Sequence, residues 1–281
     1  MTPSPARVAL DARPEAILER LPAMGRVMLV GRNDGVTHER IGPVGDVMAR
    51  GGYARISGDC HDGALISLRV DKVVLDVSST MKDKVFPRID FMTKDGIAAA
   101  SVVGMEGLEP FEAALADVAR GAAEDAPPRE APGERQELAD DDPARAPFEA
   151  AVASGAAVRI EFRGPSFTQR WQGRIEATRP AMGFLNVMTP DFHLHLKGGA
   201  VAEWRVETGP EGAALAAIGA DGAPIGLYLQ ADRMADLGHA RADLVAHAPG
   251  TWIAPADGRE IGHGALMAKM AQRRVVLLGE T

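Results

Sequence analysis

Alternating apolar and polar residues predict that most of this chain forms β-strands, with short helices at a few places. Ile89–Gly96 and Leu215–Gly222 are apolar runs that end in Asp-Gly and lead into another apolar run, a pattern typical of a β-hairpin. Apolar residues at helical spacing occur instead in Pro14–Met24, Leu108–Val118, Ala146–Ala153 and Met234–Ala246. Runs of strands with helices at their ends predict an α+β fold with antiparallel sheets.

Three blocks of the pattern occur twice and in the same order. The first copies are Val27–Gly42, Ile66–Leu75 and Ile89–Gly96, and the second copies are Val158–Gly173, Leu194–Glu203 and Leu215–Gly222. The glycines that close the first pair of blocks lie about 131 positions apart. In the second pair we expect strand, tight turn, strand, with Gly198-Gly199 as a two-residue hairpin turn. The repeated order indicates an internal duplication.

A segment of different composition separates the two copies. Residues 121–146 hold four prolines and eight acidic residues against three arginines. Such a segment buries little apolar area, so we interpret it as a mobile acidic linker, the alternative being a charged tail that binds a partner. The predicted organisation is a first repeat at 14–120, a linker at 121–146, and a second repeat with a C-terminal extension at 147–281.

Charge and cysteine content restrict the class of protein. The formal net charge is -8, whereas a nucleic-acid-binding protein usually carries a basic face. Cys60 is the one cysteine, so no intramolecular disulfide forms and a reducing compartment is favoured. The first ten residues lack the apolar segment of a signal peptide, and no stretch approaches the 18 apolar residues of a membrane helix. We therefore expect a cytoplasmic protein.

Local sequence in both copies resembles one known family. Ile17–Met28 with Thr37–Glu39 in the first copy, and Gly183–Leu196 in the second, are similar to the hemin-degrading HemS/ChuX family. The resemblance implies an internally duplicated fold with two large stacked antiparallel β-sheets, flanking helices and a cleft for heme. It also implies a cytoplasmic protein of heme uptake and iron utilisation that passes heme on or degrades it. The implied partners are heme, and a heme oxygenase or a TonB- or ABC-type heme uptake system.

The sequence departs from this family at two places that concern heme. The second repeat of heme-binding members carries Gln-Ile-His-Thr-Gly, whose histidine ligates the iron, whereas Gln169–Gly173 reads Gln-Arg-Trp-Gln-Gly. Trp171 therefore stands at the position of the ligand histidine, and an indole has no free lone pair for iron. The family's later basic run is replaced by Gln230–Ala235, in which Arg233 is the one cation.

Histidines are the first candidates for replacing the missing iron ligand. His193 and His195 are two positions apart on a predicted strand, so their side chains share one face. We interpret this pair as the best candidate for contact with heme or iron. His38 is a further candidate, since its offset from Gly42 places it on the same strand face as the Trp171 position. For each of these histidines the alternative is a hydrogen-bonded side chain that holds the fold.

Other candidates are weaker. The cations Arg163, Arg170, Lys197 and Arg205 suit heme propionates, because a guanidinium fork matches a carboxylate, although each also fits a solvated strand position. Cys60-His61 and His263 lie in predicted loops. One Cys/His pair supplies at most half of a zinc site.

No sequence motif of a nucleotide-binding, metalloprotease or serine hydrolase site occurs in the chain. Catalysis would therefore depend on bound heme itself. Our first hypothesis is heme binding and trafficking. The alternatives are a heme-degrading, oxygenase-like enzyme, and a binding or regulatory module that has lost heme, which Trp171 and the missing basic run favour.

Overall fold

The computed structural model describes residues 6–82, 84–125, 138–209 and 211–239, together with the backbone of three later strands. The strands of the first half are β1 Arg7–Leu10, β2 Arg26–Asn33, β3 Val36–Pro43, β4 Asp46–Arg50, β5 Tyr53–Gly58, β6 His61–Leu65, β7 Lys72–Asp76, β8 Thr80–Met81, β9 Lys84–Val85, β10 Arg88–Met92, β11 Ala98–Gly104 and β12 Arg120–Ala123. Those of the second half are β13 Ala157–Arg163, β14 Phe167–Arg174, β15 Arg179–Ala181, β16 Phe184–Thr189, β17 Phe192–Lys197, β18 Glu203–Gly209, β19 Gly212–Ile218 and β20 Pro224–Ala231. The strands β21 Val245–Ala248, β22 Thr251–Ala254 and β23 Arg259–Gly262 pair with one another.

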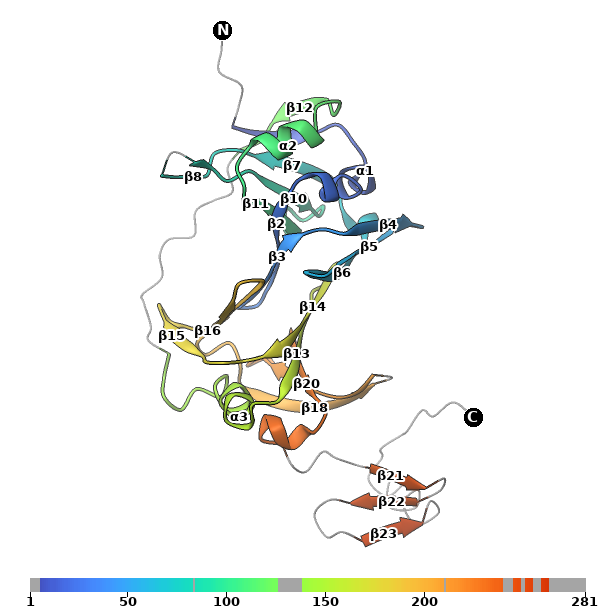
Figure 1. The fold of residues 1–281 in the computed structure, drawn as a ribbon, viewed down its shortest axis with the longest axis vertical. Coiled ribbons are helices and arrows are strands. Elements are labelled where there is room, and N and C mark those ends of the chain that lie inside the picture. The colour runs from blue at the N-terminus through green and yellow to red at the C-terminus, as the bar shows by residue number, and fades with distance from the viewer. Residues whose placement is uncertain are drawn as a thin grey trace.

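Two large antiparallel sheets dominate the described part of the chain (Figure 1). One has ten strands in the order β12-β1-β7-β10-β11-β2-β3-β17-β16-β15. The other has eight strands in the order β18-β19-β20-β13-β14-β6-β5-β4. The predicted α+β fold with two large antiparallel sheets is thus confirmed.

Each sheet contains strands from both halves of the chain. β3 pairs with β17 in the ten-stranded sheet, and β14 pairs with β6 in the eight-stranded sheet. β3 and β14 begin 131 positions apart, and so do β5 and β16. In the ten-stranded sheet, each of the eight strands from β7 to β15 has a counterpart in the other repeat. Replacing each strand by its counterpart gives the strand order of the eight-stranded sheet. The internal duplication is therefore confirmed, and the two copies complete each other's sheets.

Two details of the predicted duplication are wrong. Gly198-Gly199 closes no hairpin, because β17 and β18 belong to different sheets and the chain crosses between the sheets here. In the first copy, Ile66–Leu75 holds the 3-10 turn η2, Ser67–Arg69, and then β7, instead of two strands. The correct correspondence is shifted by three residues, since Lys72 and Glu203 begin the equivalent strands β7 and β18.

Short helices close the outer end of each repeat. The first repeat has α1 Pro14–Leu18, η1 Leu21–Ala23 and α2 Glu109–Ala114, and the second has α3 Ala146–Ser154 and η3 Met234–Leu237. Figure 1 shows the first group at one end of the molecule and α3 with η3 at the other. The helix expected over Met234–Ala246 is limited to η3, because Gly238 turns into the left-handed region at φ 76°. No helix in the described ranges is long and apolar enough to cross a membrane.

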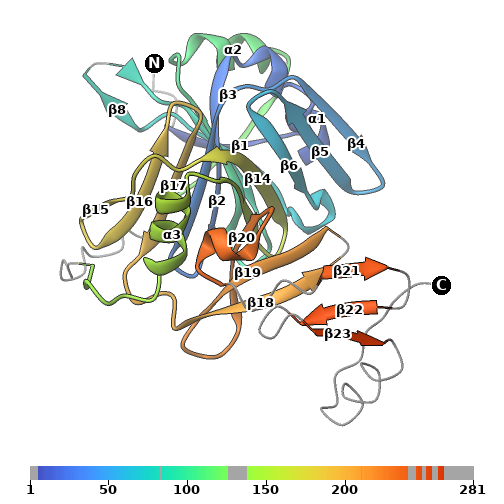
Figure 2. The same ribbon diagram turned by 60° about the horizontal axis from the view of Figure 1, so that its bottom comes forward.

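Buried apolar residues of both sheets and of the helices at both ends form one continuous core, and Figure 2 shows the arrangement of these elements from a second side. Phe162 and Phe167 of the eight-stranded sheet are fully buried, as is Phe192 of the ten-stranded sheet. Burying one such side chain contributes about 1.5–3 kcal/mol. Gly31 is required for this contact, since a Cβ atom there would lie 2.5 Å from the Phe162 ring.

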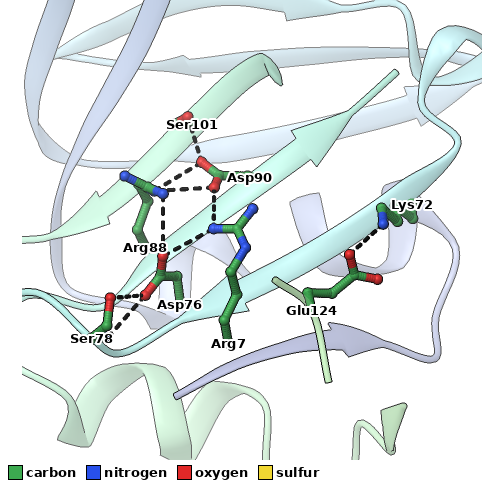
Figure 3. A network of polar contacts seen from close by, with 8 residues as sticks. All are labelled: Arg7, Lys72, Asp76, Ser78, Arg88, Asp90, Ser101 and Glu124. Atoms are coloured by element: carbon green, nitrogen blue, oxygen red, sulfur yellow. Dashed lines mark hydrogen bonds and ion pairs between the residues drawn. The ribbon is translucent and has the colours of Figure 1, made fainter. Parts of the chain in front are cut away.

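A buried charge network ties the far strands of the ten-stranded sheet together (Figure 3). Arg7 Nη1 donates hydrogen bonds to Asp76 at 2.9 Å and to Asp90 at 3.1 Å, and Arg88 contacts both carboxylates from the other side. The side chains of Arg7, Asp76 and Asp90 are at most 10% exposed. Because these residues come from β1, β7 and β10, the network fixes the order of strands that are distant in sequence.

Both ends of the segment expected to be a linker belong to the fold. Its first residues complete β12, which pairs with β1, and near its other end Leu138 and Ala144 are buried. Asp142 accepts a hydrogen bond from the backbone N–H of Gly199. The acidic and proline-rich middle, residues 126–137, lies outside the described residues, as do residues 263–281 of the C-terminal extension.

Candidate functional site

His38 and Gln169 occupy equivalent positions of the two repeats and contact each other where the sheets meet. Gln169 Nε2 lies 2.9 Å from His38 Nδ1, and His38 Nε2 lies 3.3 Å from the Ile160 carbonyl oxygen. The imidazole therefore accepts a hydrogen bond from Gln169 at Nδ1 and donates a hydrogen bond from Nε2 to the Ile160 carbonyl oxygen. Burial lowers the pKa of His38 to about 3, against the opposing effect of the Ile160 hydrogen bond. This neutral, doubly hydrogen-bonded side chain joins the sheets and offers heme iron no free nitrogen.

Trp171 is also part of the interior. Trp171 is only 5% exposed. Its ring stacks on the ring of Phe192, with 4.7 Å between the centroids and 11° between the planes. The indole covers Gly173, where a Cβ atom would lie 2.4 Å from the ring. At the position where the family resemblance implies an iron ligand, this chain therefore has an aromatic stack.

His193 and His195 project together from the outer face of the ten-stranded sheet, as the alternation along a strand predicts. Both belong to β17, and Glu39 of the neighbouring strand β3 is paired in register with His193. Glu39 Oε2 lies 3.4 Å from His193 Nδ1 and 3.7 Å from His195 Nε2. The side chains of the two histidines are 25% and 30% exposed, and that of Glu39 is 10% exposed. Two imidazoles and one carboxylate thus converge at the surface.

Asn186 of β16 sets the orientation of His195. The amide nitrogen of Asn186 donates to the carbonyl oxygens of Arg179 at 2.8 Å and Phe184 at 3.2 Å. Its oxygen therefore faces His195 Nδ1, at 2.6 Å. Since an amide oxygen only accepts, His195 Nδ1 carries the proton and Nε2 points toward Glu39.

Glu39 is ionised at neutral pH despite its burial. Burial by itself would raise the pKa of Glu39, but its contacts with His193 and His195 and the charge of Arg32 lower this pKa to about 2. Sequence reasoning identified the two histidines and not Glu39 as their partner, because the contact depends on the pairing of β3 with β17.

A cavity of about 650 Å³ lies at one end of the ten-stranded sheet. The β10–β11 hairpin, the residues before β7 and the β13–β14 turn enclose it. Its apolar lining residues are Leu68, Val70, Ile97, Ala98, Ala99, Phe162 and Pro165. Its charged lining residues are Arg32, Arg69, Lys94, Asp71 and Asp95, and Asn33, Thr93, Gly164 and Ser166 complete it. The volume falls in the range of about 300–1,000 Å³ typical of small-molecule sites.

The predicted propionate contacts Arg163 and Arg170 line a separate cleft of about 380 Å³ on the eight-stranded sheet. Arg163 lies 2.8 Å from Glu161, and Arg170 contacts Glu161 and Glu211 at 3.3 and 3.2 Å. Burial would raise the pKa of Glu161, but the two arginines hold it below its ordinary value. Arg163 also lies over the Tyr228 ring, 4.1 Å from its centroid. Because carboxylates of the chain already pair with both guanidinium groups, this cleft is poorly suited to a second carboxylate ligand.

The other residues that the sequence suggested for heme or metal contact do not form a common site in the part of the chain that the structure describes. Lys197 is exposed, and Arg205 is an exposed partner of Glu203. His61 is buried and donates from Nε2 to the Gly42 carbonyl oxygen at 3.0 Å, while the side chain of Cys60 packs against the same glycine. Neither residue belongs to a group of metal-ligating side chains within the described ranges. His263 lies outside the described residues.

Solved structures with the same architecture come from heme metabolism. The fold is similar to that of the heme degrading enzyme ChuS of Escherichia coli O157:H7, with a TM-score of 0.66 and 20% identity over 81% of this chain and 82% of that one. It is also similar to holo-PhuS, a heme-binding protein from Pseudomonas aeruginosa, with a TM-score of 0.64 and 22% identity over 81% and 82% of the two chains. No curated protein sequence matches the chain.

The first repeat is similar in sequence to a known family. Residues 8–109 match the family model described as Haem utilisation ChuX/HutX. The likeness to the HemS/ChuX family is thus found in the sequence of the first repeat and in the fold of most of the chain. The matched range runs from β1 to the start of α2. It includes Glu39 and the cavity residues Arg32, Arg69 and Lys94, whereas His193 and His195 belong to the second repeat. The family resemblance inferred from the sequence is confirmed.

Proposed function

We propose that this protein binds heme in the cavity of about 650 Å³ and delivers it within the cytoplasm. The observation that carries the proposal is the lining of the cavity, which combines apolar walls with the cations Arg32, Arg69 and Lys94. An apolar lining suits the porphyrin face, and cations suit the two propionates. Arg69 is already oriented at this place, because its guanidinium group donates a hydrogen bond to the Pro165 carbonyl oxygen.

The way in which heme would bind follows from the absence of iron-ligating side chains among the described residues of the cavity lining. None of the described lining residues is a histidine, cysteine, methionine or tyrosine, the side chains that ligate heme iron. His193 and His195, our first candidates for iron contact, do not line the cavity. Binding is therefore expected to depend on the porphyrin ring and its propionates, with Asp71 and Asp95 directing the carboxylates toward the three cations.

Binding without a protein ligand to the iron favours heme trafficking over heme degradation. A heme-degrading enzyme holds the iron by an axial ligand and keeps its distal face open, and the described lining offers no such ligand. Release is easier when no bond to iron has to break. The partners that this role implies are a heme oxygenase that accepts heme, or a TonB- or ABC-type uptake system that supplies it. The single cysteine, Cys60, agrees with a cytoplasmic location.

Removing two cavity cations tests the proposal. The full-length protein titrated with hemin is expected to show a saturable, one-to-one change in the Soret band. The double variant Arg69→Ala/Lys94→Ala is expected to bind hemin about 100-fold more weakly, since a charge-assisted hydrogen bond contributes about 1.5–3 kcal/mol. The matched control is Arg205→Ala, which removes an exposed cation elsewhere.

Two outcomes would contradict this assignment. If the double variant binds hemin as the unchanged protein does, the cavity is not the heme site. If the unchanged protein shows no saturable binding, the chain is a family member that has lost heme and serves as a binding or regulatory module.

A further inference from the structure

Glu39, His193 and His195 have the composition and spacing of a metal site. Their three ligand atoms lie within 4.8 Å of one another. Ligands that share one zinc ion at about 2.0–2.2 Å lie about 3–3.5 Å apart. The distances from Glu39 to the two imidazoles already approach this range, so small rotations of the side chains would close the cluster around an ion.

Asn186 prepares His195 for metal binding. In protein metal sites a ligating imidazole usually donates its second N–H to an oxygen, which fixes the tautomer and the ring. Asn186 plays this part here, at 2.6 Å from His195 Nδ1. His195 Nε2 therefore points toward the carboxylate of Glu39, which is the orientation that a shared metal ion requires.

The duplicated fold shows that these residues are not needed to form the sheet. The positions equivalent to Glu39, His193 and His195 are Arg170, Asp62 and Ala64, on the equivalent strands β14 and β6. The same strand pairing therefore forms with an arginine, an aspartate and an alanine. The two histidines and the carboxylate are therefore particular to the pairing of β3 with β17 and are not a requirement of the fold.

We propose that Glu39, His193 and His195 bind a divalent transition-metal ion, with the remaining coordination positions open to water or an external ligand. Two histidines and one carboxylate form the ligand set of catalytic zinc sites of the thermolysin type and of non-heme iron(II) sites. The partial exposure of both histidines leaves the open side of such a site accessible. The proposal is independent of heme binding in the cavity.

Zinc titration of the metal-free protein tests the site. The full chain, treated with EDTA and dialysed, is titrated with Zn²⁺ in a calorimeter, and with Co²⁺ while the visible absorption is recorded. One ion per chain is expected. His193→Ala and His195→Ala should each weaken Zn²⁺ binding at least 100-fold, and Asn186→Ala about 10–100-fold because only the support of His195 is lost.

Control variants separate this site from other histidines. His239→Ala removes a half-buried imidazole just after η3, and His247→Ala/His263→Ala removes two whose side chains lie outside the described residues. Both controls should keep full Zn²⁺ affinity. Far-UV circular dichroism checks that each variant is folded, and the partly exposed His193 and His195 are replaced without opening the core.

The inference is overturned if no stoichiometric Zn²⁺ binds, or if His193→Ala and His195→Ala bind Zn²⁺ as tightly as the unchanged protein. It is separable from the heme proposal. His195→Ala should still bind hemin, whereas Arg69→Ala/Lys94→Ala should lose hemin affinity and keep Zn²⁺.

Discussion

His38 and Trp171 show how single side chains were adapted to the interior of this protein. Trp171 stands at the family's position of the iron ligand, His38 is a candidate from its strand face, and both side chains are buried. His38 joins the two repeats through Gln169 and Ile160. Trp171 stacks on Phe192. At the residue scale, these positions contribute to stability, and ligand binding is expected elsewhere.

The buried imidazole of His38 makes stability depend on pH. Its pKa is about 3 in the folded protein and about 6.5 when unfolded. The unfolded chain therefore binds an additional proton between these values, and the free energy of unfolding falls by about 1.4 kcal/mol per pH unit below pH 6.5. The free energy of unfolding, measured with urea, should fall between pH 7.5 and pH 5.0 by about 2 kcal/mol more in the unchanged protein than in His38→Gln. Equal losses in the two proteins would mean that His38 is not buried as a neutral side chain.

Replacing Trp171 by the family's histidine should not restore an iron ligand. Trp171→His leaves part of the stack on Phe192 empty, and a large-to-small change in a core costs about 2–5 kcal/mol. Thermal unfolding is expected to show this loss, while the Soret band of bound hemin stays as in the unchanged protein. A new imidazole-ligated spectrum would show that this position faces heme.

At the scale of elements, the charge network of β1, β7 and β10 determines how the end of the ten-stranded sheet assembles (Figure 3). Arg7 reaches Asp76 and Asp90 over 69 and 83 positions of sequence. Neither residue pattern nor charge spacing indicates this contact in advance, because a strand's neighbours depend on the topology of the whole sheet.

Removal of Arg7 is therefore expected to destabilise the fold strongly. Arg7→Ala leaves the two buried carboxylates with Arg88 as their remaining cation in this network, beside hydrogen bonds from Ser78 and Ser101. Breaking a buried ion pair costs about 3–5 kcal/mol. Lys72→Ala, which removes the exposed partner of Glu124 beside the network, should cost less than about 1 kcal/mol. Denaturant unfolding measures both values, and similar small losses in the two variants would refute the assigned role of Arg7.

At the scale of the whole molecule, the sequence predicts those features of the fold that depend on the local pattern of apolar, polar and turn residues. Asp-Gly turns after apolar runs correctly indicate the β10–β11 and β19–β20 hairpins, and the repeated blocks correctly indicate the duplication. Gly198-Gly199 misleads, because a turn signal does not tell which sheet the next strand joins. The partnership of Glu39 with His193, and the cavity that Phe162 of one repeat lines with Arg69 of the other, depend on contacts between repeats. Such contacts have no local signal in the sequence.

A comparison of hemin with iron-free protoporphyrin IX tests the central claim most directly. The claim is that the cavity binds the porphyrin ring and its propionates without a protein ligand to iron. Fluorescence-quenching titrations of the full-length protein should therefore give dissociation constants for the two compounds that agree within about threefold, or about 0.7 kcal/mol. Tight binding of hemin with no binding of protoporphyrin IX would contradict the account, because it would require an iron ligand that the cavity lining does not contain.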